Sequence, residues 1–172
     1  MIIREMMPNK RSELENFLYT AIFITKGMLK PPKSIIERPE LQIYIKNFGN
    51  CAADVCFVAE IDKKIVGVCW SRLMNDYGHI DDKTPSLALS VYENFRRKVI
   101  ATALLKRIFA CLVEKNFKQV SLSVQKENFA AVNLYRKLNF EVFAEKIPNT
   151  SCGADWRNNL AQRQKNCIHY LC

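Results

Sequence analysis

Histidine is scarce in this sequence and no paired cysteine motif occurs, which argues against a metal centre. The 172 residues include only two histidines, His79 and His169, and seven cysteines, an odd number with no C-x-x-C pair among them. Zinc sites are built mainly from His and Cys side chains at short, regular spacing, so we expect no metal ion. In a reducing compartment most of these thiols act as small apolar residues, an interpretation that suits Cys69 and Cys111 best.

Long apolar runs are also missing. No stretch approaches the ~20 apolar residues that a membrane-spanning helix needs, and the first ten residues, MIIREMMPNK, lack the hydrophobic segment of a signal peptide. We therefore expect a cytoplasmic location and no membrane partner. With 49% hydrophobic and 25% charged residues, the composition is that of an ordinary globular protein long enough for one domain with its own core.

Basic residues are in excess, and the formal net charge is +9. A basic surface can bind nucleic acid, an anionic membrane or a polyanionic cofactor, or it can serve solubility alone. The charge is informative where it clusters beside a binding geometry, as it does at Arg96, Arg97 and Lys98. No nucleic-acid recognition motif with interleaved aromatic residues accompanies it, so we expect no specific nucleic-acid partner.

Hydrophobic periodicity predicts an α/β protein. Helical spacing is found at residues 8–23, 35–48, 100–116 and 128–139, and the strongest of these patterns is 100–116. Strand patterns are found at residues 1–5, 55–61, 64–73, 86–91, 118–124 and 140–145. Strands and helices alternate in the second half of the chain, which is typical of a sheet with helical crossovers.

The segment FRRKVIATALL, residues 95–105, joins a predicted strand to the strongest predicted helix and contains no glycine. A helix N-terminus offers unpaired N–H groups and partial positive charge, both of which suit phosphate oxygens. Arg96, Arg97 and Lys98 add charge-assisted contacts. Taken alone, this segment is equally well explained as a pyrophosphate site or as an ordinary basic turn.

A second segment favours the pyrophosphate site. It has the pattern N-x-x-A-x-x-L-Y-x-K-x-x-F, formed by Asn128, Ala131, Leu134, Tyr135, Lys137 and Phe140. By this pattern and by element order, residues 2–145 resemble the GNAT N-acetyltransferase superfamily, small enzymes that use acetyl-CoA. The basic loop resembles the family motif [QR]-x-x-G-x-[GA] through Arg96 and Ala101. The resemblance implies an α/β fold with a mixed central sheet, splayed central strands and flanking helices.

The resemblance also implies the site. The backbone of Leu89, Ser90 and Val91 would bond the pantetheine arm, and Asn128 would contact the cofactor. The pyrophosphate would be surrounded by Arg96, Arg97, Lys98, Val99, Ile100, Ala101 and Thr102. Tyr135 would act as the general acid that protonates the thiolate, because a phenol pKa of ≈ 10 is close enough to a thiol pKa of ≈ 8.5. A primary amine, on a small molecule or a peptide, would attack the thioester directly.

Val99 occupies the position where the family has a glycine. A β-branched residue is strongly disfavoured where the backbone needs positive φ. Two outcomes stay open: a loop that still binds acetyl-CoA with the help of its basic side chains, or a GNAT-fold binding or regulatory module in which valine fills the phosphate space. Asn139 replaces a second family glycine, and asparagine tolerates the left-handed conformation such a turn needs.

The residues that would bind the acceptor amine are marked less clearly in the sequence than those that would bind the cofactor. Candidates to bind or deprotonate an amine are Asp76, Tyr77, His79, Asp81, Asp82 and Glu60. His79 has the intrinsic pKa of a base, but each candidate taken singly is better explained as an ordinary polar residue, so we assign no general base. We expect a GNAT-like domain at residues 1–145 and an atypical tail at 146–172 that is partly disordered or supplies one edge strand. A homodimer is left open.

Overall fold

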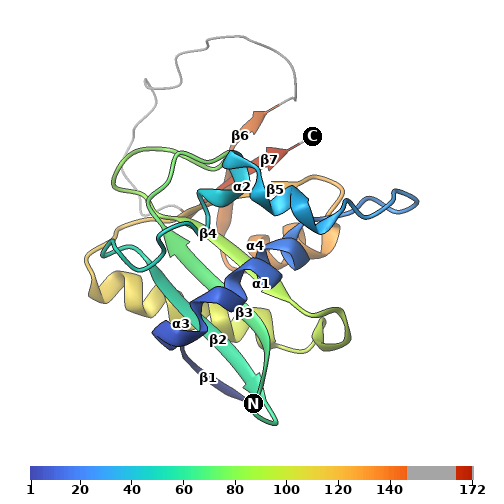
Figure 1. Ribbon diagram of the computed structural model, residues 1–172. Helices are drawn as coiled ribbons and strands as arrows, with labels where there is room; N and C mark the ends of the chain where they lie inside the picture. Colours follow the sequence, from blue (N-terminus) through green and yellow to red (C-terminus); the bar gives the residue numbers. More distant parts are fainter. Residues whose placement is uncertain (147–165, 172) are drawn as a thin grey trace.

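A mixed seven-stranded sheet forms the centre of the protein. The computed structural model describes residues 1–146 and 166–171 (Figure 1). The strands are β1 Ile2–Glu5, β2 Val55–Ile61, β3 Lys64–Arg72, β4 Ser86–Val91, β5 Ser121–Gln125, β6 Phe140–Lys146 and β7 Asn166–Leu171, and their order in the sheet is β1-β2-β3-β4-β5-β7-β6. Neighbours from β1 to β4 are antiparallel, and those from β4 onward are parallel. The predicted α/β class and mixed sheet are confirmed.

Helices cover both faces of this sheet. They are α1 Leu14–Ala21, α2 Pro39–Gln42, α3 Ile100–Glu114 and α4 Phe129–Lys137. In Figure 1 α1 crosses the front of the sheet, whereas α3 lies behind it. The helices pack into two separate hydrophobic clusters. One contains Leu104, Leu105 and Ile108 of α3 with Tyr135 of α4, and the other contains Leu14, Phe17 and Leu18 of α1.

The helix predicted at residues 35–48 is wrong in extent. Its α-helical part is the single turn of α2, preceded by a 3₁₀ turn at Lys33–Glu37. Pro39 lacks an amide hydrogen and holds Arg38 in an extended conformation, so a helix can only begin there. Beyond α2 the chain continues in turns with local backbone hydrogen bonds, such as that from the amide of Lys46 to the carbonyl oxygen of Gln42 at 2.8 Å, and Trp70 Nε1 on β3 donates to the carbonyl oxygen of Tyr44 at 3.1 Å.

The end of the chain contributes a strand, but not at an edge. β7 pairs with β5 on one side and with β6 on the other, which corrects the expected edge strand. The rest of the predicted tail, residues 147–165 and 172, lies outside the described residues. Among the helices of residues 1–146, none is long and apolar enough to cross a membrane.

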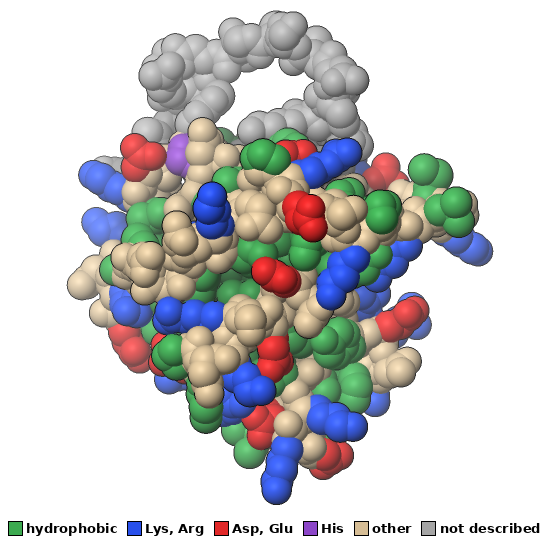
Figure 2. Space-filling model, in the orientation of Figure 1, with side chains coloured by type: hydrophobic (Ala, Val, Ile, Leu, Met, Phe, Trp, Pro, Cys, Tyr) green, Lys and Arg blue, Asp and Glu red, His purple; other side chains and the backbone are tan. Residues whose placement is uncertain are grey.

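The surface charge is mixed on the face that Figure 2 shows. Basic and acidic side chains are interspersed there, with apolar groups between them. The excess of positive charge therefore does not form one continuous patch on this face.

Candidate active site

Strands β4 and β5 form a fork. They are parallel neighbours, yet their only paired position among the described residues is Ser86 with Ser121, where the amide of Ser121 also donates to the carbonyl oxygen of Pro85 at 3.0 Å. Beyond this point the strands diverge, and β5 pairs with β7 on its other side. The splayed central strands that the sequence implied are confirmed, and β4 has an open edge toward the gap.

The open edge of β4 presents backbone groups of two predicted residues. The amide of Tyr92 donates to the carbonyl oxygen of Val66 on β3 at 3.0 Å. Backbone groups of successive strand residues point alternately to the two neighbours, so Ser90 faces β3, whereas Leu89 and Val91 face the gap. The fork therefore offers the N–H groups of both residues and the C=O group of Leu89 to a ligand, whereas the carbonyl oxygen of Val91 accepts a hydrogen bond from Arg96.

The basic loop follows directly at the end of β4. Arg96, Arg97 and Lys98 are all exposed, and Arg96 Nε donates to the carbonyl oxygen of Val91 at 2.9 Å. Within the described part of the chain, the amides of Arg97, Lys98 and Val99 have no hydrogen-bond acceptor. Free amides and basic side chains at the start of a 15-residue helix make a suitable anion site.

In this loop the left-handed conformation is found at a different residue from the one where the family has its glycine. The left-handed residue is Arg97, with φ 61°, two positions before the expected glycine position. Val99 caps α3 with φ 13° and ψ −5°, and its side chain is 77% exposed. Ile100 is buried, while Ala101 and Thr102 lie half-buried in the first turn of α3. The valine therefore points away from the core, at the same end of the helix as the free amides.

Tyr135 lies on α4, in the hydrophobic cluster on the α3 side of the sheet. It is 8% exposed, and its ring centroid lies 5.4 Å from that of Phe140. Burial, reinforced by the nearby Cys69, raises the pKa of its hydroxyl well above the usual value. No hydrogen-bond partner for this hydroxyl is found among residues 1–146. The hydroxyl is therefore buried and protonated.

Two asparagines behave as their positions predict. Asn128 caps α4, and its side-chain oxygen accepts a hydrogen bond from the amide of Ala131 at 3.3 Å. Asn139 adopts φ 60° in the turn between α4 and β6, the left-handed conformation that asparagine tolerates.

Two buried polar atoms on the arms of the fork have no partner among the described residues. They are Ser90 Oγ on β4 and Gln125 Oε1 on β5. Counting in steps of two from the paired Ser86 and Ser121, these residues lie on the same face of the sheet. A buried polar atom without a partner is costly unless something supplies a hydrogen bond. Together with the open edge of β4, they fit an elongated polar ligand lying along the fork.

A buried polar network lies at the root of the fork. Asp76, only 7% exposed, accepts hydrogen bonds from Tyr44 Oη at 2.7 Å, Ser86 Oγ at 2.7 Å and the amide of Gly78 at 3.1 Å. Ser86 Oγ also lies 3.2 Å from Ser121 Oγ, so the network spans both strands where they separate. Of the predicted acceptor-side candidates, Asp76 is the one that the structure places at the fork.

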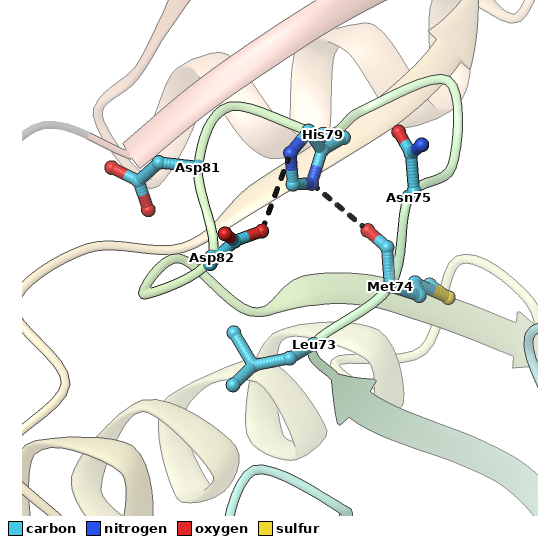
Figure 3. A pocket seen from close by; sticks show the side chains of 6 residues that line it. All are labelled: Leu73, Met74, Asn75, His79, Asp81 and Asp82. Atoms are coloured by element: carbon cyan, nitrogen blue, oxygen red, sulfur yellow. Dashed lines mark hydrogen bonds and ion pairs between the residues drawn. The ribbon is translucent and has the colours of Figure 1, made fainter.

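Three other candidates of this loop, His79, Asp81 and Asp82, line a surface cavity of about 260 Å³. Figure 3 shows His79 between Asp82 and the backbone of Met74, with Asp81 pointing away from the ring. His79 Nε2 lies 4.0 Å from Asp82 Oδ1, and Nδ1 lies 3.2 Å from the carbonyl oxygen of Met74. Tyr77 is 47% exposed. This cavity lies at the start of β4, at the opposite end of the strand from the basic loop.

Glu60 is not brought to the fork. It lies on β2, which β3 separates from β4, and it accepts a hydrogen bond from Arg4 Nε at 3.0 Å. Within residues 1–146, no group of His, Cys, Asp and Glu side chains has the arrangement of a metal site.

The fold and the fork define a class of protein: an α/β fold with a mixed sheet whose central strands separate beside a helix N-terminus. The Acetyltransferase (GNAT) family profile matches residues 24–140, and the chain belongs to this family. The N-alpha-acetyltransferase of Sulfurisphaera tokodaii is 34% identical over 92 residues, which are 49% of this chain and 55% of that protein. An acetyltransferase of Pectobacterium atrosepticum is 33% identical over 104 residues, 60% of this chain and 67% of that protein. The chain thus spans about half of the archaeal relative it matches.

Solved structures agree on the fold. A ribosomal-protein-alanine N-acetyltransferase from Brucella melitensis aligns with a TM-score of 0.57 at 17% identity, covering 82% of this chain and 85% of that one. The structure of AAC(6')-Iy in complex with the bisubstrate analog CoA-S-monomethyl-acetylneamine aligns with a TM-score of 0.54 at 19% identity, covering 81% and 90%. At such identities the likeness is one of fold.

Sequence reasoning missed the partners of Asp76. Of these partners, Ser86 belongs to a row of serines, with Ser121 and Ser123 on β5, that interrupts apolar strands on one face of the sheet. Nothing local in the sequence marked Tyr44, because its position depends on β3 and on the loop that carries Asp76.

Proposed function

We propose that this chain is an acetyl-CoA-dependent N-acetyltransferase that acts on a primary amine. The observation that carries the proposal is the continuity of the open β4 edge with the free amides and basic side chains at the start of α3. An elongated ligand with a pyrophosphate at one end matches this arrangement.

The residues present fit such a co-substrate. Backbone groups of Leu89 and Val91 would hold its amide-containing arm, and the loop from Arg96 to Thr102 would hold its phosphates, with Asn128 and Ser90 beside the arm. Acetyl-CoA, when bound, supplies an acetyl group activated as a thioester.

Tyr135 is proposed as the general acid. Because burial raises the pKa of this tyrosine, the hydroxyl keeps its proton throughout the physiological pH range. The raised pKa also makes this phenol a weaker acid than an exposed tyrosine, so its proposed role is first to donate a hydrogen bond to the sulfur and then to transfer the proton as negative charge develops there when the carbon–sulfur bond breaks. No side chain has to form a covalent intermediate if the amine attacks directly.

The proposed acceptor is the primary amine of a small molecule or peptide. The names of the relatives support both kinds: N-alpha-acetyltransferase in one case, a complex with an acetylneamine derivative in another. We further propose that residues 1–145 form the catalytic domain and residues 146–172 an extension that supplies β7.

The first test is Tyr135→Phe. Calorimetric titration with acetyl-CoA should give the same Kd as the unaltered protein, while thiol release with a panel of amines should fall by about 100-fold, because general acid catalysis contributes roughly 10²–10⁴-fold. Tyr19→Phe is a matched control, since its hydroxyl donates to the carbonyl oxygen of Pro31 at 2.6 Å, away from the fork. Full activity of Tyr135→Phe would refute the assignment, and failure of the unaltered protein to bind acetyl-CoA would refute the proposed function.

A further inference from the structure

Ser90 on β4 and Gln125 on β5 each bury a polar atom that no group in the described part of the chain satisfies. Ser90 Oγ and Gln125 Oε1 have no hydrogen-bond partner there, and Ser90 is only 4% exposed. A polar atom that leaves water without gaining a new hydrogen bond destabilises the folded chain, so such atoms are rare in native proteins. Two of them on the arms of one fork indicate that a ligand supplies the missing bonds.

These two residues lie opposite each other across the gap. Ser86 pairs with Ser121 at the branch, and their hydroxyl oxygens are 3.2 Å apart, so both side chains lie on one face of the sheet. Ser90 and Gln125 each follow four residues further along these parallel strands. Because side chains alternate between the two faces of a strand, both return to the face of the branch serines and lie at the same depth in the fork.

The face that carries this pair is the one covered by α1. Ala88 and Tyr92, which flank Ser90 on its own face, pack against the hydrophobic cluster of α1. The centroid of the Tyr92 ring lies 4.8 Å from that of Phe17 on this helix. The alternate residues of both strands belong instead to the cluster of α3 and α4, which contains Tyr135. The pair therefore approaches the gap from the face opposite to the proposed proton donor.

Along the fork, the pair lies nearer to the basic loop than Tyr135 does. The amide of Asn128 donates to the carbonyl oxygen of Gln125 at 3.0 Å, so α4 begins level with the end of β5. Since β5 and β6 are both parallel to β7, the helix between them runs back toward the branch. Tyr135 follows Asn128 by about 10 Å of helix. A ligand that extends from Tyr135 to the basic loop therefore passes the pair between its two ends.

The two side chains offer complementary hydrogen-bonding groups. The oxygen Oε1 of Gln125 only accepts, so it needs an N–H group, whereas the hydroxyl of Ser90 can donate to a carbonyl oxygen. The N–H and C=O groups of a trans amide point in opposite directions, so one amide across the gap suits both arms of the fork. Acetyl-CoA has two amides between its thioester and its phosphates, and the open backbone edge of β4 can bond the second.

We propose that Ser90 and Gln125 form an amide clamp, which binds one amide of the acyl donor and fixes how far the donor enters the fork. The inference rests on the proposed function, in which acetyl-CoA is that donor. The backbone edge of β4 can bond any extended chain with polar groups, whereas the amide clamp requires an amide at one position along the chain. The pair is therefore specificity-determining: it selects donors with an amide-containing arm and aligns their thioester with Tyr135.

The first test measures the stability of the protein without ligand. Ser90→Ala and Gln125→Leu remove the unpartnered atoms at little change in volume, so each should raise the midpoint of thermal unfolding by about 2–4 °C. Ser71→Ala is the matched control, because Ser71 is buried on β3 and its Oγ donates to the carbonyl oxygen of Ala53 at 2.8 Å. Its midpoint should fall by a similar amount. A lower midpoint in both clamp variants would mean that the protein itself satisfies these atoms, and it would overturn the proposal.

The second test measures binding by calorimetric titration. The Kd values for acetyl-CoA and for acetyl-pantetheine should rise roughly 5- to 10-fold in Ser90→Ala and in Gln125→Leu, because each variant loses one hydrogen bond to the arm. Adenosine 3′,5′-bisphosphate has phosphates but no arm, so its Kd should not change. Ser71→Ala should bind each ligand as the unaltered protein does. The amide clamp thus predicts higher stability together with weaker binding, a combination that a purely structural role does not produce.

The outcomes separate the amide clamp from the proposed function. If the unaltered protein binds acetyl-CoA and both variants bind it equally well, the clamp is refuted and the proposed function stands. If the variants lose affinity for adenosine 3′,5′-bisphosphate as much as for acetyl-CoA, the replacements disturb the whole site, and the clamp is again refuted. If the unaltered protein does not bind acetyl-CoA, the proposed function and the clamp are refuted together.

Discussion

Val99 and Arg97 show how a loop without glycine can still present free amides. Arg97 takes the left-handed conformation, which costs a non-glycine residue about 1 kcal/mol or more. The exposed side chain of Val99 then lies at the start of α3, near the amides that have no acceptor among the described residues. The basic side chains therefore favour binding of an anion at this site, whereas the methyl groups of Val99 oppose it.

Replacing this valine should therefore strengthen binding. We expect Val99→Gly to lower the Kd for acetyl-CoA roughly fivefold, or about 1 kcal/mol, because two methyl groups leave the mouth of the anion site. The measurement is calorimetric titration. Val99→Thr keeps the branched shape and should show no gain. Equal affinities in all three proteins would mean that the valine does not limit binding.

Local signals in the sequence predicted some site residues well. Asn128 opens the helical pattern of residues 128–139, and it caps α4 by accepting a hydrogen bond from the amide of Ala131. Such caps depend on contacts within one turn, which the sequence specifies directly. Tyr44 was missed because its hydrogen bond to Asp76 joins residues 32 positions apart.

At the scale of elements, strong periodicity was a reliable guide and weak periodicity was not. The helix predicted at 100–116 is α3, and Leu104, Leu105, Ile108 and Leu112 are buried along its inner face as expected. The pattern at 35–48 gave only one α-helical turn, because Pro39 prevents the helix from starting earlier and residues 43–48 form turns. A helix of fifteen residues with one apolar face is stable because each turn buries apolar side chains, whereas a short, interrupted helix buries too few of them to offset the cost of its formation.

The inner face of α3 makes a sharp prediction about stability. Ile108 is fully buried in the cluster behind the sheet, whereas Val113 on the same helix is 68% exposed. We expect Ile108→Ala to lower the free energy of unfolding by about 2–5 kcal/mol and Val113→Ala to change it by less than about 0.5 kcal/mol. Urea unfolding followed by circular dichroism measures both. Similar values for the two variants would contradict the assignment of the inner face.

Across the whole molecule, the two ends of β4 differ in charge. The loop before the strand carries Asp76, Asp81 and Asp82, and the loop after it carries Arg96, Arg97 and Lys98. A ligand with phosphates at one end and an amine partner at the other matches this polarity. The net charge of +9 adds a weaker, general attraction for anions.

This polarity predicts salt-dependent binding. We expect the Kd for acetyl-CoA to rise roughly fivefold between about 50 mM and about 500 mM NaCl, since exposed charges are screened over a few ångströms at high salt. Acetyl-pantetheine has no nucleotide phosphates, so its Kd should stay constant. Both are measured by titration at fixed pH. A salt effect of equal size for the two ligands would argue against an anion site at the basic loop.

The sequence by itself determined the α/β class, most strands, the long helix α3, the family resemblance and the cap of α4. Each of these depends on periodicity or on contacts within a few residues. Only the tertiary structure decided where β4 and β5 separate, that β7 lies between β5 and β6, and that Asp76 is buried against Tyr44. Those features depend on pairing and burial between distant segments, which a linear pattern does not encode.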